Sequence, residues 1–293
     1  MHLFPQNVEP KDYKIKPDYN PTIVGHRGVV YCEPENTISS FQTAAAVGCH
    51  AVELDVFLLK CNTVIVFHGD GNDENPGGLK SHCGVEGSIL DYTLEDVRKL
   101  SFVEGDAHFC PNQKLAMATI PTLEEVLEVA KEIGFDVKIE LKGPGTEEPV
   151  LEIVERMGMV DQCTFSSFHH ERIERIRELH PQKHTDGSYV YKTGALFTEC
   201  PEDFIARAKK VEASEVHLCY DTCTRERVKA IHEEGMGSLA WFCGPMTMKK
   251  HCDEKYLDVG NEDASMYQMV LHSGVEALCV NRPEVLLNVV SIK

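Results

Sequence analysis

Short apolar segments alternate with amphipathic segments along almost the whole chain. Apolar runs rich in β-branched residues predict strands, and apolar positions at helical spacing predict helices. We expect strands near 22–26, 51–58, 63–68, 136–142, 163–168, 194–198, 214–219, 237–243 and 276–281. Helices should lie between them, including Ser39–Gly48, Thr122–Ile133, Arg172–Leu179, Thr224–Glu234 and one that follows Pro283.

The repeated strand-then-helix order predicts an α/β fold with a parallel sheet. About eight such repeats predict closure into a TIM (β/α)8 barrel, a fold that commonly occupies about 250 residues as one domain. We therefore expect one domain over residues 1–293, with an N-terminal extension at 1–20.

One stretch interrupts this alternation. Residues 69–118 are rich in Gly, Asn and Asp and hold one short helical pattern after Thr93. About 50 residues is too long for an ordinary connection, so the pattern indicates a small insertion subdomain after the second strand region.

Charge and composition narrow the class of function. The net charge of −18 argues against nucleic acid or an anionic membrane surface as partner. A phosphate substrate stays compatible if a few cations gather in one pocket. The sequence contains no apolar leader region and no membrane-spanning run, and its 12 cysteines have no CxxC spacing, which favours a cytoplasmic protein with reduced thiols. The spacing of His217, Cys219 and Cys223 leaves zinc as a less favoured alternative, because no second ligand pair follows.

Two predicted strands carry charged residues on one face. Residues i and i+2 of a strand share a face, so Glu53 and Asp55 lie together, and so do Lys138, Glu140 and Lys142. A face in water is the simpler explanation for a single strand. Here helices should cover the apolar face, so Glu53, Asp55 and Glu140 converge inside the barrel with the ammonium of Lys142. Three carboxylates predict one divalent cation, and all-oxygen ligation favours Ca²⁺ or Mg²⁺ over zinc.

Two histidines each end an apolar strand, His26 after Thr22–Gly25 and His68 after Val64–Phe67. The C-terminal strand edge is where active sites of barrel enzymes lie, so we expect both imidazoles to act as acid and base in catalysis. A structural role is the usual alternative for a lone histidine. Arg27 is suited to hold a phosphate oxygen, and a surface ion pair is its alternative.

Several motifs resemble the glycerophosphodiester phosphodiesterase family in order and spacing. They are His26-Arg27-Gly28, Pro34-Glu35-Asn36-Thr37, Glu53-Leu54-Asp55-Val56, Ile120-Pro121-Thr122-Leu123 and Glu140-Leu141-Lys142. The resemblance extends through Ser167-Phe168, Glu234-Gly235-Met236 and Gly274-Val275-Glu276, and so runs from about Thr22 to Glu284.

The resemblance implies a TIM barrel that hydrolyses glycerophosphodiesters to sn-glycerol 3-phosphate and an alcohol. It implies Glu53, Asp55 and Glu140 as metal ligands, His26 and His68 as general base and acid, and Arg27 and Lys142 as phosphate ligands. The attacking oxygen is water or a neighbouring hydroxyl of the substrate, which would form a cyclic phosphate.

The sequence also departs from the family pattern. Gly69 separates His68 from Asp70, where the family has His followed directly by Asp. The family's Trp-Thr-Val-Asn reads Trp241-Phe242-Cys243-Gly244 here, and its Thr-Asp-x-Pro reads Val280-Asn281-Arg282-Pro283. We expect Trp241 to line the substrate pocket, with ordinary core packing as an equal alternative.

Two other functions stay open. One is a related barrel lipid phosphodiesterase that acts on lysophospholipids as a phospholipase D. The other is a barrel that binds a phosphorylated metabolite or a metal without turnover, although all seven proposed chemical residues are present. A homo-oligomer is compatible with the sequence and is not indicated by it.

Overall fold

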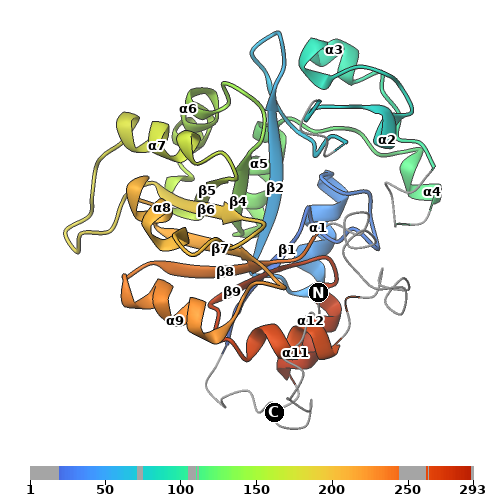
Figure 1. Ribbon diagram of the computed structural model, residues 1–293. Helices are drawn as coiled ribbons and strands as arrows, with labels where there is room; N and C mark the ends of the chain where they lie inside the picture. Colours follow the sequence, from blue (N-terminus) through green and yellow to red (C-terminus); the bar gives the residue numbers. More distant parts are fainter. Residues whose placement is uncertain are drawn as a thin grey trace.

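The described residues form a closed barrel of eight parallel strands. The computed structural model describes residues 20–70, 75–104, 110, 112–243, 262 and 264–291. The barrel strands are β1 (Thr22–Gly25), β2 (Ala51–Leu58), β4 (Asp136–Leu141), β5 (Cys163–Ser167), β6 (Lys192–Phe197), β7 (Glu215–Cys219), β8 (Gly237–Trp241) and β9 (Ala277–Val280). They lie side by side in the order β1-β9-β8-β7-β6-β5-β4-β2, and β1 pairs with β2 to close the ring (Figure 1). The predicted TIM barrel is confirmed.

Helices follow most of the barrel strands and cover their outer faces (Figure 1). The longer ones are α1 (Ile38–Val47), α5 (Leu123–Ile133), α6 (Glu147–Met157), α7 (His170–Leu179), α8 (Phe204–Lys210), α9 (Arg225–Glu233), α11 (Ala264–Leu271) and α12 (Pro283–Ser291). The predicted capping box before α5 is present, because Thr122 and Glu125 each accept a hydrogen bond from the other's backbone N–H. Gly48 ends α1 in the left-handed conformation, as a C-terminal glycine should.

The strand expected near 63–68 is present, but it is not one of the parallel strands of the barrel. β3 (Val64–Val66) pairs antiparallel with the last residues of β2, with Val56 opposite Val66 and Leu58 opposite Val64. Only a short turn through Asn62, whose φ is +60°, separates the two strands. Parallel strands need a crossover of about a dozen residues or more, so this connection permits only a hairpin.

The inward and outward faces of the strands follow the predicted alternation. Val52, Leu54 and Val56 of β2 join the main apolar core, together with Val137 and Ile139 of β4. Polar side chains occupy the opposite face. Lys138 Nζ lies 2.8 Å from Glu215 Oε2, which in turn lies 2.8 Å from His217 Nε2. This buried ion pair accounts for Lys138 without a catalytic role.

The insertion adds a second apolar cluster beside the hairpin. Phe57, Leu59, Ile65 and Phe67 from β2 and β3 pack with Leu79, Cys83, Ile89, Val97, Phe102, Cys110, Leu115 and Ile120. The short elements here are α2 (Lys80–Cys83), η2 (Ile89–Asp91), α3 (Leu94–Val97) and α4 (Asn112–Leu115), and η3 (Val160–Gln162) precedes β5. Figure 1 shows α2 and α3 near the upper end of β2, and α9 and α11 at the bottom of the view. The bounds 69–118 stay a prediction, and residues 1–19 lie outside the described part of the chain.

The three residues of the less favoured zinc alternative have other partners. His217 hydrogen-bonds to Glu215, Cys219 Sγ lies 3.9 Å from Cys243 Sγ, and Cys223 Sγ lies 3.5 Å from Ser273 Oγ.

Within the described ranges, no helix is both long enough and apolar enough to cross a membrane.

Candidate active site at the barrel mouth

Three carboxylates from two neighbouring strands meet inside the barrel. The register of β2 and β4 places Asp55 opposite Glu140, and Glu53 lies two residues earlier on the same face. Each of the three offers one oxygen, and these oxygens lie within 4.8 Å of one another. Glu53 is 9% exposed and Asp55 is 1% exposed. The structure therefore brings together the three residues that strand alternation selected.

Burial and mutual repulsion make this cluster costly without a cation. Burial and the nearby Asp55 and Glu140 raise the pKa of Glu53 well above its ordinary value. Burial also raises the pKa of Glu140 to about 7, although Lys142 opposes this shift. Burial acts in the same direction on Asp55, but Lys142, His68 and Arg27 together hold its pKa below the ordinary range. A set of hard oxygen donors with this surplus of negative charge fits a divalent cation.

Arg27 lies against the cluster in a strained backbone conformation. Its φ is +52°, which lets its backbone N–H donate to Glu53 Oε2 at 3.1 Å. The guanidinium Nη1 lies 3.1 and 3.0 Å from the two carboxylate oxygens of Glu35. Burial lowers the pKa of Arg27, but Glu35, Asp55 and Glu53 outweigh it and raise that pKa above its ordinary value. Arg27 is thus a fixed cation beside the carboxylates.

Arg27 keeps one N–H group that an anionic ligand could use. Nε lies 3.5 Å from Asp55 Oδ2, yet among the described residues it has no hydrogen-bond partner. Gly28 continues the loop at φ +92°, and a Cβ there would lie 2.2 Å from Ser40 Oγ, so only glycine permits this turn. Lys142 follows β4 and brings Nζ to 3.5 Å from Asp55 Oδ1. Two cations therefore flank one carboxylate.

His26 follows β1 and is held by an amide from the end of β9. Asn281 donates through Nδ2 to the carbonyl of Cys243 at 2.7 Å and to a carboxylate oxygen of Glu262. Its Oδ1 therefore faces His26 Nδ1, 2.8 Å away, and accepts the proton of that nitrogen. Nε2 lies 3.8 Å from Glu53 Oε2. Burial and the charge of Arg27 lower the pKa of His26 to about 3.

His68 reaches the same mouth by the returning hairpin rather than from a parallel strand. The backbone N–H of Phe67 donates to the carbonyl of Asp55 at 2.9 Å, which sets the following residue beside the carboxylates. His68 Nδ1 lies 2.9 Å from the carbonyl of Gly69 and donates to it in the neutral ring. Burial, Arg27 and Lys142 lower the pKa of His68 well below its ordinary value. His68 therefore follows an antiparallel strand, whereas the sequence pattern placed it at the C-terminal edge of the barrel strands.

Trp241 ends β8, and its ring meets that of Phe168 edge-on, with 5.4 Å between centroids. It packs against the main core and against the apolar floor of the barrel, which is made of Val24, Ala51, Leu239, Ala277 and Cys279. Within the described part of the chain, its buried Nε1–H has no hydrogen-bond partner. Core packing is therefore part of its role, and the indole N–H is a donor that a ligand could use.

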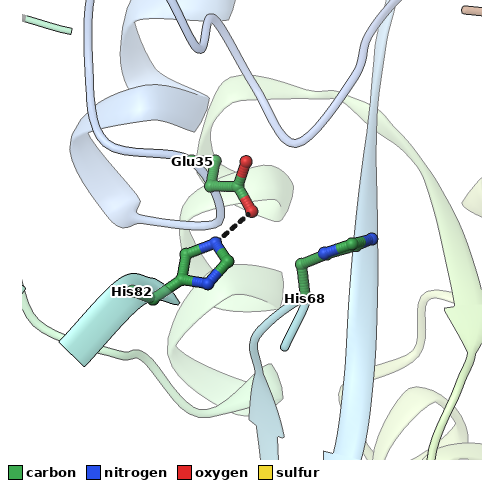
Figure 2. A group of neighbouring side chains, drawn as sticks. All are labelled: Glu35, His68 and His82. Carbon is green, nitrogen blue, oxygen red and sulfur yellow. Dashed lines mark hydrogen bonds and ion pairs between the residues drawn. The ribbon is translucent and has the colours of Figure 1, made fainter. Parts of the chain in front are cut away.

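Sequence reasoning assigned no role to several polar residues that build this site. Asn36, at φ +56°, donates from Nδ2 to Asp55 Oδ2 at 2.9 Å. Asn281 and Glu262 hold His26 as described above. His82 Nε2, from the insertion, lies 3.1 Å from Glu35 Oε1 (Figure 2). Glu35 and Asn36 were visible in the Pro34–Thr37 motif, and Asn281 was visible as a departure. Nothing in the sequence indicated His82 or Glu262.

The chain is similar to known proteins over nearly its whole length. The model of the glycerophosphoryl diester phosphodiesterase family matches residues 26–285. A glycerophosphodiester phosphodiesterase of Caldanaerobacter subterraneus subsp. tengcongensis is 28% identical over 92% of this chain and 97% of its own. One from Bacillus subtilis is 26% identical over 87% of this chain and 86% of its own.

Solved structures agree on the fold. A phosphodiesterase from Oleispira antarctica, solved with the product sn-glycerol 3-phosphate, superposes with a TM-score of 0.73 at 23% identity. The match covers 92% of this chain and 97% of that one. At this level of identity the likeness shows a common fold only.

Proposed function

Because the chain belongs to the glycerophosphoryl diester phosphodiesterase family and is a phosphoric diester hydrolase, we propose that it cleaves glycerophosphodiesters at the barrel mouth. The products would be sn-glycerol 3-phosphate and an alcohol. The observation that carries the proposal is the meeting of three carboxylates, two imidazoles and two fixed cations around Asp55.

Glu53, Asp55 and Glu140 would hold one Ca²⁺ or Mg²⁺ ion. When bound, such an ion neutralises the charge that develops on the phosphoryl oxygens. The support for it is the donor set itself. Burial raises the pKa of both Glu53 and Glu140, and the neighbouring carboxylates add to this shift at Glu53, so a bound cation would favour the charged forms.

Arg27 and Lys142 would bind and orient the phosphate. Arg27 is pinned by Glu35 on one side, so its remaining N–H groups can be directed at phosphate oxygens at little entropic cost. Lys142 stands on the opposite side of Asp55, which keeps both cations near the mouth in the absence of substrate.

His26 would serve as general base. Asn281 keeps the ring proton on Nδ1, so Nε2 presents its lone pair to the attacking hydroxyl. The depressed pKa of His26 keeps the ring neutral at physiological pH, as a base must be.

His68 would serve as general acid. Arg27 and Lys142 depress its pKa, and a bound phosphodiester anion would offset both cations and favour the protonated ring. In the reaction a new oxygen–phosphorus bond forms as the bond to the alcohol breaks. The proton of the attacking hydroxyl passes to His26, and the proton of His68 passes to the leaving oxygen.

The test is a coupled assay of glycerol 3-phosphate release from glycerophosphocholine, glycerophosphoethanolamine and glycerophosphoglycerol. We expect release that stops with chelator and resumes with Ca²⁺ or Mg²⁺. Lysophosphatidylcholine assayed in parallel tests the lipid phosphodiesterase alternative, and faster cleavage of that lipid would overturn the proposed substrate class. No release from any diester would favour a barrel that binds without turnover.

We also propose that the protein works in a reducing compartment such as the cytoplasm. The eleven described cysteines are all unpaired. Purification without reductant, followed by thiol counting, would show disulfides if this is incorrect.

A further inference from the structure

A chain of polar contacts runs from the insertion to the guanidinium of Arg27. It begins at Asp70, passes through Ser81 and His82, and reaches Arg27 through Glu35. The contacts join residues that are far apart in the sequence, since His82 and Glu35 are separated by 47 positions. The chain of contacts ends at the guanidinium of Arg27.

Asp70 explains why glycine interrupts the His-Asp pair of the family pattern. Gly69 adopts φ +76°, and a Cβ there would lie 2.0 Å from the carbonyl oxygen of Pro76. The turn carries Asp70 into the insertion, where its carboxylate accepts from the backbone N–H of Lys80 at 3.1 Å and of Ser81 at 2.9 Å. The Ser81 hydroxyl also donates to Asp70. Asp70 thus fixes the start of α2, the element that carries His82.

His82 points inward from α2 and is 4% exposed. Its Nδ1 lies 3.1 Å from Ser81 Oγ, and its ring meets the ring of Phe67 edge-on at 5.3 Å. These two contacts direct Nε2 at Glu35 Oε1, 3.1 Å away, as Figure 2 shows. A ring fixed from three sides provides a rigid support for the carboxylate.

Glu35 transmits this support to Arg27. Its Oε1 accepts hydrogen bonds from His82 Nε2 and from Arg27 Nη1. Its Oε2 also accepts a hydrogen bond from Arg27 Nη1. Glu35 is 7% exposed, so water cannot easily replace a lost partner. Without His82 the carboxylate would keep Arg27 as its main partner and could rotate with it.

A metal site is the rival explanation for these residues, because Glu35, His68 and His82 each offer an atom within 4.8 Å of the others. One contact argues against it, because the guanidinium of Arg27 already neutralises Glu35. Figure 2 shows His82 facing Glu35 while the ring of His68 is directed to the side of β2.

We propose that His82 is a positioning residue by which the insertion holds Glu35, and through it the Arg27 guanidinium, in the geometry that binds the substrate phosphate. The inference deepens the proposed function and rests on it for the identity of the phosphate ligand. His82 does not touch the reacting atoms.

The experiment measures the Kd of sn-glycerol 3-phosphate by calorimetry on the full chain with Mg²⁺, and the KM for glycerophosphocholine in parallel. His82→Leu removes the donor to Glu35, whereas His82→Gln can supply a side-chain N–H at a similar reach. We expect His82→Leu to raise Kd and KM by the same factor, roughly 10- to 100-fold, because a buried hydrogen bond to a charged group is lost. His82→Gln should stay within about threefold of the wild type.

Two comparisons separate positioning from folding. In an Arg27→Ala background, His82→Leu should have no further effect on Kd, since its effect passes through Arg27. Lys80→Ala, on the same helix with its side chain in an exposed ion pair, should leave Kd and KM unchanged. If His82→Leu does not fold, Ser81→Ala replaces it as the test variant, because it removes the contact to His82 Nδ1. Ser81→Ala should then raise Kd at least about threefold.

The proposal is overturned if His82→Leu leaves Kd unchanged, or if it weakens binding equally with and without Arg27. It is also overturned if the wild type binds Zn²⁺ at a site that both His82 variants lose, since that outcome makes His82 a ligand. Dependence of Kd on His82 in a chain that cleaves none of the diesters would sustain the positioning role while the proposed function fails.

Discussion

Asn281 Oδ1 and His26 Nδ1 lie 2.8 Å apart. The amide of Asn281 cannot rotate to exchange its oxygen and nitrogen, because Nδ2 donates hydrogen bonds to the carbonyl of Cys243 and to Glu262. The side chain of Asn281 therefore determines which nitrogen of His26 carries the proton. In the family pattern an aspartate stands at this position, whereas here an amide faces His26 and the carboxylate of Glu262 contacts that amide.

Replacement of Asn281 should separate these effects. Asn281→Leu removes the acceptor, and we expect kcat for glycerophosphocholine to fall about 10- to 100-fold with little change in KM. Asn281→Asp keeps an acceptor but adds a negative charge, which raises the pKa of His26 from about 3. The acid limb of the kcat/KM profile should then move to higher pH. An unchanged profile in Asn281→Asp would show that Asn281 does not act through His26.

The two imidazoles should each be required for turnover. His26→Ala or His68→Ala should lower kcat by roughly 10²–10⁴, the usual contribution of a general acid or base. Retention of the cation in both variants, measured by calorimetry, serves as the control for an intact site. Near-normal rates in both would exclude the assignment of base and acid.

The fold and the carboxylate cluster could be predicted because both follow from short-range regularities. The alternation of apolar runs gave the barrel, and the spacing of Glu53 and Asp55 placed two carboxylates on one inner face. The direction of β3 could not be predicted from its apolar run, because a parallel and an antiparallel strand show the same pattern of apolar residues. The short turn at Asn62 was a usable signal of a hairpin.

The supporting residues could not be predicted, because their contacts depend on tertiary structure. His82 meets Glu35 across 47 residues, and Glu262 meets Asn281 across 19. Neither pair has a local motif, and a lone histidine in an Asn- and Gly-rich insertion has no periodic context. Only the folded insertion shows that His82 is buried and contacts Glu35.

Cation binding should depend on pH in a direction set by Glu140 and Glu53. In the metal-free protein the pKa of Glu140 is about 7 and that of Glu53 is also raised, so protons occupy sites that the cation needs. The gain in Tm on adding saturating Mg²⁺ should be larger at pH 8 than at pH 6. Without metal, the stability that protonated Glu140 contributes should be lost as pH rises through about 7. Equal gains in Tm at both pH values would contradict this coupling.

The nature of the attacking oxygen can be decided with one substrate analogue. If the neighbouring glycerol hydroxyl attacks, an analogue that lacks this hydroxyl should not be cleaved. If water attacks, with His26 as base, the analogue should be cleaved at a rate close to that of glycerophosphocholine. Mass spectrometry of early reaction mixtures supplies the control, because only the first route passes through a cyclic phosphate.

Calorimetric titration of the chelator-treated protein with Ca²⁺ and with Mg²⁺ tests the central claim most directly, namely that Glu53, Asp55 and Glu140 form one cation site. We predict one ion per chain for the wild type and for His68→Ala, and binding at least about tenfold weaker for Asp55→Asn and Glu140→Gln. Unchanged affinity in both carboxylate variants would place the ion elsewhere and contradict the account.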